Sequence, residues 1–180
     1  SDESLGYSEQ AVEVLKQPGH IAWNIYDQKL HELMMEFEDY NNAMDAKAIR
    51  QAANIDALAE ITGIDMQSLA TTITEVEKLA KGIEKDTFGR SFEGKSPLKP
   101  PYYTVKVTGA LFHTQGGLVV DKNARVLTEK GNPLPNLFAG GGAARGISGP
   151  SNWGYIAGNG LLTATTFGRL AGSTAAAMVT

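Results

Sequence analysis

Apolar side chains recur at helical spacing over residues 7–80, which predicts a mainly helical first part. Leu69, Ile73 and Val76 form such a stripe, and Asp65 stands where it can cap the helix that carries them. A β-prone run at 20–26 predicts one short strand, and the acidic segment 36–45 predicts a solvated, turn-rich surface. The predicted helices are 7–16, 28–37, 54–61 and 66–80.

The pattern changes after residue 80. Residues 81–101 are rich in glycine and proline and predict a loop, whereas residues 101–108 alternate as a strand does. A hairpin is predicted around Lys122-Asn123, and a short strand at 137–139 precedes a long apolar helix over 159–178. These elements predict an α+β fold, with a mostly helical part followed by a small sheet piece and a long C-terminal helix.

The stretch between the last strand and the last helix carries the clearest candidate chemistry. Three consecutive glycines, Gly140, Gly141 and Gly142, follow the strand, and Gly158 and Gly160 lead into the helix. Glycine at this density indicates sharp turns or a close approach of the backbone to another group. A helix N-terminus offers free N–H groups and the positive end of its dipole, so the segment predicts a cofactor contact. The alternative, a flexible surface loop, fits less well because the segment joins two apolar elements and carries few charges.

Composition and charge remove several classes of function. The chain has 180 residues, a net charge of −4 and a pI near 5.4, which argues against a nucleic-acid-binding protein. No apolar run is long enough for a membrane span. Because cysteine is absent, disulfides, thiolate metal ligands and a cysteine nucleophile are excluded, and the three histidines are too scattered to predict a metal site. The G-x-G-x-x-G spacing of a dinucleotide-binding unit does not occur.

Several motifs, in the right order, resemble one superfamily of flavoproteins. It comprises the FAD-dependent fumarate reductases, the succinate dehydrogenase flavoproteins and the 3-ketosteroid dehydrogenases, and its C-terminal flavin-binding segment is similar to residues 131–141, 148–160 and 167–172. The resemblance implies that residues 1–100 are part of a substrate cap. Residues 101–180 would then be the C-terminal part of the FAD-binding domain, without its N-terminal dinucleotide-binding unit. Asp86-Thr-Phe-Gly-Arg90 resembles the D-x-x-F-G-R element, in which Arg90 binds a carboxylate or, as the alternative, forms a structural salt bridge.

The same resemblance implies which residues meet FAD. Gly116 and Gly117 belong to an H-T-x-G-G motif whose backbone passes close to the flavin ring. The N–H groups of the turn at 158–160 would face the pyrimidine edge of that ring. The implied cofactor-binding residues are Gly116, Gly117, Gly140, Gly141, Gly142, Ser148, Gly158, Asn159, Gly160 and Leu161.

Three side chains are implied to be catalytic. His113, directly before the glycine pair, is of the type that reaches substrate in fumarate reductases, although a lone histidine can also be structural. Tyr103 stands where a hydroxyl meets substrate in ketosteroid dehydrogenases; the alternative is a buried ring whose hydroxyl bonds to a backbone carbonyl. Tyr155 lies in a run similar to F-G-Y-x-A, where the tyrosine polarises a substrate carbonyl. No metal is expected.

The implied function is that of the C-terminal portion of an FAD-dependent oxidoreductase. It would reduce or form a C=C bond next to a carbonyl group, with hydride transfer at flavin N5. Ser151-Asn152-Trp153 lacks the arginine that clamps a carboxylate in fumarate reductases, which argues against a simple C4 dicarboxylate. The alternative from another class is a non-catalytic partner or assembly module.

The expected partners follow from the missing dinucleotide-binding unit. They are the N-terminal half of the same flavoprotein and a small-molecule substrate, with no nucleic acid and no membrane span; a homo-oligomer is a further expectation, because a chain without its sheet partner exposes apolar surface. We expect the isolated chain to be inactive and its location to be the cytoplasm.

Overall fold

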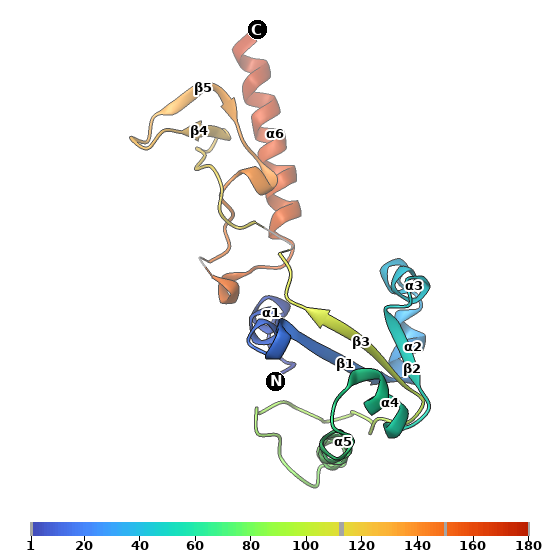
Figure 1. The fold of residues 1–180 in the computed structure, drawn as a ribbon. Coiled ribbons are helices and arrows are strands. Elements are labelled where there is room, and N and C mark those ends of the chain that lie inside the picture. Colours follow the sequence, from blue (N-terminus) through green and yellow to red (C-terminus); the bar gives the residue numbers. More distant parts are fainter. Residues whose placement is uncertain (1, 112–113, 150, 180) are drawn as a thin grey trace. The chain divides into compact units, whose positions relative to one another are not determined.

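The structure is a computed structural model that describes residues 2–111, 114–149 and 151–179. It divides into two compact units: unit 1, Ser1–Gly109, and unit 2, Ala110–Thr180 (Figure 1). Helices and small sheets occur together, so the predicted α+β class is confirmed. Over the described ranges, no helix has both the length and the apolar character needed to cross a membrane.

Unit 1 is built on a three-stranded antiparallel sheet with the order β1-β3-β2. Its central strand comes last in the unit, and Tyr103 pairs with Tyr26 on one side and with Gln51 on the other. The elements of unit 1 are α1 (Tyr7–Leu15), η1 (Pro18–His20), β1 (Ile21–Asp27), α2 (Gln28–Met34), α3 (Glu38–Asp45), β2 (Ile49–Ala52), α4 (Ile55–Thr62), α5 (Met66–Ala80) and β3 (Tyr102–Thr108).

Two neighbouring tyrosines of β3 divide the core of unit 1 between the two faces of the sheet. Side chains alternate across a strand, so Tyr102 and Tyr103 point to opposite faces. Tyr103 packs with Tyr26, Ile49 and side chains of α2 and α3. Tyr102 packs with Ala52, Leu58 and Leu69 together with side chains of α4 and α5. Helices therefore cover both faces of this small sheet.

Capping residues set the ends of α4 and α5. The side chain of Asn54 accepts a hydrogen bond from the N–H of Ala57 at 2.9 Å, and α4 ends at Gly63, whose φ is +72°. The carboxylate of Asp65 accepts from the N–H of Ser68 at 2.9 Å, which confirms the predicted cap of α5.

Two elements of unit 1 differ from the sequence prediction. The segment expected as an acidic turn-rich surface contains α3, because Glu38 and Asp39 favour the first turn of a helix and Tyr40 is buried against the sheet. The edge strand β2 was not predicted, since four residues with only their two ends buried carry no alternating pattern.

Unit 2 contains a small irregular sheet and one long helix. β4 (Arg125–Leu127) pairs antiparallel with β5 (Pro133–Phe138), and a further bridge between Val120 and Val126 confirms the predicted hairpin. The strand β5 begins earlier than the predicted 137–139. The remaining elements are η2 (Gly141–Ala143), η3 (Asn152–Gly154) and α6 (Asn159–Val179). The core is small and consists of Val126, Ala139 and Ala144, against which Phe167 of α6 packs.

The boundary between the units differs from the expected division at residues 100 and 101. β3 is hydrogen-bonded between β1 and β2, so it belongs to unit 1 and the chain leaves that unit after Gly109. A Cβ on Gly109 would lie 2.7 Å from Cγ of Leu15, which shows how closely α1 covers the end of this strand.

Candidate functional site

The N-terminus of α6 offers unpaired backbone N–H groups. α6 begins at Asn159, directly after Gly158, whose φ of +79° lies in the left-handed region that favours glycine. The N–H of Leu162 donates to the carbonyl oxygen of Gly158 at 3.0 Å, the first bond of the helix. In the part of the chain that the structure describes, the amides of Gly160 and Leu161 have no acceptor. Together with the helix dipole, these two amides can bind an electron-rich group.

Asn159 ties this end of the helix to two loops. Its side chain is 4% exposed, and its Nδ2 donates to Oγ of Ser148 at 3.0 Å and to Oε1 of Gln115 at 3.3 Å. Oγ of Ser148 also accepts from the N–H of Ile156 at 3.2 Å. Oδ1 of Asn159 is buried and has no hydrogen-bond partner among the described residues. Because buried acceptors are normally paired, packing within this chain does not complete the site.

Three of the predicted cofactor glycines are required by packing within unit 2. A Cβ on Gly117 would lie 2.5 Å from the carbonyl carbon of Ala144, a contact that backbone cannot accommodate. Gly140 and Gly141 lie against α6, and a Cβ on Gly140 would be 3.0 Å from Cβ of Phe167. These glycines allow the backbone of the loops and the helix to approach one another.

The other four predicted glycines have open space beside them. A Cβ on Gly116, Gly142, Gly158 or Gly160 would meet no atom of the chain within 4 Å. At position 158 the left-handed backbone conformation is the reason why glycine is favoured. Packing within the described chain does not require glycine at the other three positions, which leaves room for a group outside the chain to approach them. Gly168 and Gly172 of α6 have the same open space.

Large apolar side chains are exposed along the same segment. Trp153 is 72% exposed and Leu161 is 80% exposed. Ile147, Ile156 and Leu162 are exposed as well. Apolar side chains gathered in this way mark a surface that a ligand or another protein surface covers.

Tyr155, one of the predicted catalytic residues, belongs to unit 2. Tyr155 is half-buried and directly follows η3. His113 lies outside the described residues. Their catalytic roles stay predictions.

Tyr103 belongs to unit 1, where its hydroxyl is paired with side chains. It donates to Oε1 of Gln28 at 2.7 Å and accepts from Nε2 of Gln51 at 3.1 Å. Burial raises the pKa of the Tyr103 hydroxyl, which therefore stays protonated at neutral pH. The ring is buried as the structural alternative required, although its partners are two glutamines rather than a backbone carbonyl.

A polar aromatic cluster surrounds Tyr103, and no local sequence pattern predicted it. The ring of His31 stacks on Tyr103 with centroids 4.0 Å apart and an angle of 5° between the planes. Nδ1 of His31 lies 2.7 Å from the hydroxyl of Tyr40, which lies 2.8 Å from the hydroxyl of Tyr26. Burial, and then the bond to Tyr40, raises the pKa of Tyr26. The cluster joins α2, α3, β1 and β3 by side chains.

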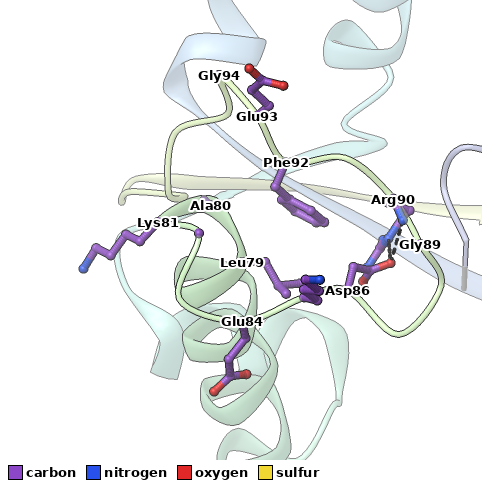
Figure 2. Close-up of a pocket in the computed structure, with 12 residues that line it drawn as sticks. Leu79, Ala80, Lys81, Glu84, Asp86, Gly89, Arg90, Phe92, Glu93 and Gly94 are labelled. Carbon is purple, nitrogen blue, oxygen red and sulfur yellow. Dashed lines mark hydrogen bonds and ion pairs between the residues drawn. The ribbon is translucent and has the colours of Figure 1, made fainter.

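Arg90 forms a salt bridge, so the structural alternative for this residue is confirmed. Its guanidinium binds both carboxylate oxygens of Asp86, with Nη2 2.7 Å from Oδ1 and Nε 3.1 Å from Oδ2, and lies between the rings of Phe88 and Phe92. The bridge borders an open hollow of about 600 Å³ in the loop after α5 (Figure 2). Lysines and glutamates line this hollow together, so it has no single charge preference.

The features at the N-terminus of α6 fit an electron-rich group. Among the described residues, two amides without an acceptor and one buried acceptor without a partner lie at this helix start, where Gly158 and Gly160 leave open space. Within residues 2–111, 114–149 and 151–179, no group of three or more His, Cys, Asp and Glu side chains could hold a metal ion. A helix N-terminus of this kind can bind an anionic or electron-rich group.

The cofactor follows from the family of the chain. Residues 5–161 match the family model described as an FAD binding domain. The chain therefore belongs to this flavoprotein family of oxidoreductases, and the prediction of FAD is confirmed.

Curated relatives are reductases and dehydrogenases. A probable fumarate reductase of Shewanella frigidimarina is 31% identical over 91% of this chain and 27% of its own length. A fumarate reductase of Schizosaccharomyces pombe is 38% identical over 70% of this chain and 24% of its own length. A 4-oxocyclohex-2-ene-1-carboxylate 5-dehydrogenase of Sinomonas cyclohexanicum is 34% identical over 66% of this chain and 22% of its own length. The chain thus spans about a quarter of the length of these relatives.

Solved structures show the same fold. The open conformation of a flavocytochrome c3 fumarate reductase is 30% identical, with a TM-score of 0.71 over 97% of this chain and 30% of that protein. A 3-ketosteroid Δ1-dehydrogenase from Sterolibacterium denitrificans is 24% identical, with a TM-score of 0.67 over 96% of this chain and 35% of that protein. The second likeness concerns the fold alone.

Proposed function

We propose that this chain is the C-terminal portion of an FAD-dependent oxidoreductase that reduces or forms a C=C bond next to a carbonyl group. The observation that carries the proposal is the N-terminus of α6, where the amides of Gly160 and Leu161 lie beside glycines with open space. The names of the relatives support it: a fumarate reductase reduces the C=C bond of fumarate, which lies between two carboxyl groups, and a 4-oxocyclohex-2-ene-1-carboxylate 5-dehydrogenase removes hydrogen at a carbon next to a carbonyl group.

The backbone of unit 2 would bind the ring and favour its reduced state. When bound, FAD supplies hydride exchange between its N5 atom and the substrate. The amides of Gly160 and Leu161 would hold the pyrimidine edge of the ring, where negative charge gathers on reduction. Because the positive end of the α6 dipole stabilises that charge, these amides would raise the reduction potential. Gly116 and Gly142 would let the backbone approach the ring.

Side chains would handle the substrate carbonyl and the proton. Tyr155 would donate a hydrogen bond to the carbonyl oxygen, and His113 would hold or move the second proton. Tyr103 would act on substrate only if its hydroxyl exchanged Gln28 or Gln51 for it.

The surroundings of the site favour an apolar substrate. The segment Ser151-Asn152-Trp153 contains no arginine, and Trp153 is largely exposed. Without a bidentate arginine clamp at this point, a simple C4 dicarboxylate would lose its strongest contact there. We therefore propose a bulkier carbonyl compound, such as a cyclic enone, as the substrate class.

The rest of the FAD site would come from an N-terminal dinucleotide-binding half. The chain spans about a quarter of the length of its relatives, and no G-x-G-x-x-G unit occurs in it. Titrating the 180-residue chain with FAD, followed by flavin fluorescence, should show no saturable binding at micromolar concentration and no turnover. Tight stoichiometric binding would contradict the division of the site that we propose.

A matched pair of glycine variants tests the contact itself. Gly160→Ala and Gly172→Ala both lie in α6, both have open space for a Cβ, and both raise the helix propensity of α6. In the flavoprotein that contains this chain, Gly160→Ala should weaken FAD binding about tenfold, because an extra methyl meets the ring at a cost near 1.4 kcal/mol. Gly172→Ala should leave FAD binding unchanged. Equal behaviour of the two variants would favour the non-catalytic module instead.

A further inference from the structure

Gln115 is a half-buried residue that holds the two glycine loops of unit 2 together. It occupies the variable position of the H-T-x-G-G motif, directly before Gly116, so the motif gave no reason to select it. Its backbone carbonyl accepts from the N–H of Gly146 at 3.1 Å. Its side-chain Oε1 accepts from Nδ2 of Asn159 at 3.3 Å. One residue thus links the loop before Gly117, the loop around Gly146 and the start of α6.

Gly146 leaves the space that the hydrogen bond between Asn159 and Gln115 occupies. A Cβ on Gly146 would lie 2.9 Å from Nδ2 of Asn159 and 3.2 Å from Oε1 of Gln115, so any side chain there would press on the pair. Ser148 supplies the second acceptor for the same Nδ2 atom. Gly146, which was not predicted to contact the cofactor, therefore makes room for a hydrogen bond within the protein.

The position of Asn159 depends on its two acceptors. Its side chain is 4% exposed and its Oδ1 atom has no partner among the described residues, so Nδ2 makes all of its side-chain hydrogen bonds. Removing the acceptor on Gln115 would leave one bond, to Ser148, on a carboxamide that already carries an unpaired atom. Buried polar groups in that state are costly, so the carboxamide and the helix start attached to it would shift.

We infer that Gln115 is a positioning residue for the flavin-facing end of α6. It holds Asn159, and through Asn159 it keeps the amides of Gly160 and Leu161 aimed at the ring. The inference rests on the proposed function, since it assigns a consequence to the same amides. It adds a residue that touches neither the substrate nor the cofactor and yet sets the binding and the potential of the flavin.

The test compares Gln115→Met and Gln115→Glu in the flavoprotein that contains this chain. Methionine has a similar length without the oxygen acceptor, whereas glutamate keeps an oxygen for Nδ2 of Asn159. Gln115→Met should weaken FAD binding roughly tenfold and shift the flavin midpoint potential to a more negative value. It should also speed hydrogen exchange at the amide of Leu162, whose bond to Gly158 is the first of the helix, in the flavin-free protein. Gln115→Glu should restore slow exchange of that amide and restore FAD affinity. Gln67→Met, an exposed position on α5, is the control and should change none of these quantities.

Each other outcome has a defined meaning. A Gln115→Met variant that is less stable but keeps the wild-type potential would show a merely structural residue and overturn the inference. Unchanged exchange and affinity would overturn it as well. If Gln115→Met does not fold, Ser148→Ala removes the other acceptor of Asn159 and must shift the potential in the same direction. If Gly160→Ala also leaves FAD binding unchanged, the proposed function fails together with the inference; if only Gly160→Ala weakens binding, the proposed function stands alone.

Discussion

Unit 1 is held together by side chains, whereas unit 2 is held together by close approach of its backbone. In unit 1, Leu58 and Thr104 are fully buried, and four aromatic rings share one cluster around Tyr103. In unit 2, the core is small and several glycines lie against backbone, whereas exposed large apolar side chains occur in both units. Side-chain packing accounts for the core of unit 1. In unit 2 the start of α6 combines backbone donors without an acceptor with a buried acceptor without a partner among the described residues, which fits a group that binds there.

The difference also separates two kinds of polar chemistry. The cluster of unit 1 pairs the hydroxyls of Tyr26, Tyr40 and Tyr103 with other side chains, which makes it suited to hold α2 and α3 on the sheet. At the start of α6, two backbone donors and the buried Oδ1 of Asn159 have no partner among the described residues. Unit 1 has such a group as well, Oγ1 of Thr104, which is buried within the sheet. Unpaired groups at a helix N-terminus are suited to binding.

The largest effect should come from the core of unit 1. Leu58 is fully buried between the sheet and α5, so Leu58→Ala should lower the free energy of unfolding by about 2–5 kcal/mol through the lost transfer energy and the cavity. Leu161→Ala in unit 2 should change it by less than about 0.5 kcal/mol, since that side chain is exposed. Urea denaturation of the chain measures both. Similar losses for the two variants would remove the contrast between the units.

The next effect should come from the backbone contacts of unit 2. Gly117→Ala places a methyl group against the backbone of Ala144 and should cost about 1–3 kcal/mol of stability. The neighbouring Gly116→Ala meets no atom of the chain and is the matched control for stability. Thermal unfolding of the two variants separates them, and an equally stable Gly117→Ala would show that packing does not require this glycine.

A smaller effect should come from the hydroxyl of Tyr103. Tyr103→Phe removes the donor to Gln28 and the acceptor for Gln51, which should cost about 0.5–1.5 kcal/mol. Tyr102→Phe on the opposite face of the sheet is the control, because among the described residues its hydroxyl has no hydrogen bond. The pairing of this buried hydroxyl with two glutamines favours a structural role. If turnover of the whole flavoprotein falls more than a hundredfold in Tyr103→Phe while stability is unchanged, a catalytic role is supported instead.

The smallest effect should be local and dependent on pH. The hydrogen bond from Arg90 holds the pKa of Asp86 at about 2, below its ordinary value of 3.8. A carboxylate with a lowered folded pKa stabilises the fold above its unfolded pKa, and this contribution is lost as the pH falls toward 2. Cleavage of the 81–101 loop by pepsin should therefore rise as the pH falls from 4 to 2. Arg90→Gln should be cleaved readily across this whole range, and a pH-independent wild type would contradict the assignment.

Elements with a strong local signal could be predicted from the sequence. The apolar stripe and the Asp65 cap predicted α5, and the glycines before the last apolar run predicted the start of α6. The cofactor contact at that start stays a prediction. Edge strand β2 and helix α3 could not be predicted, because β2 is fixed by pairing with β3 and α3 by burying Tyr40 against the sheet, and neither contact leaves a local pattern. The motif resemblance predicted FAD, whereas the glycine-rich stretch alone predicted only a cofactor of unknown kind.

Long-range side-chain contacts account for most of what the sequence did not reveal. Gln115 and Asn159 are 44 residues apart, and Gln28 and Tyr103 are 75 residues apart. No local pattern links such pairs, so the positioning role of Gln115 and the aromatic cluster around His31 required the structure. The sequence also does not show why each glycine is present. Gly117 allows close packing against the backbone of Ala144, whereas the space beside Gly160 is open.

Hydrogen exchange with and without FAD tests most directly whether unit 2 meets the flavin through its backbone. The measurement uses the flavoprotein that contains this chain and follows the amides of 140–142 and 158–162, with those around Tyr103 as the reference. We predict that FAD slows exchange in both segments of unit 2 and leaves the reference amides unchanged. Slowed exchange around Tyr103, with none at the start of α6, would contradict the central claim.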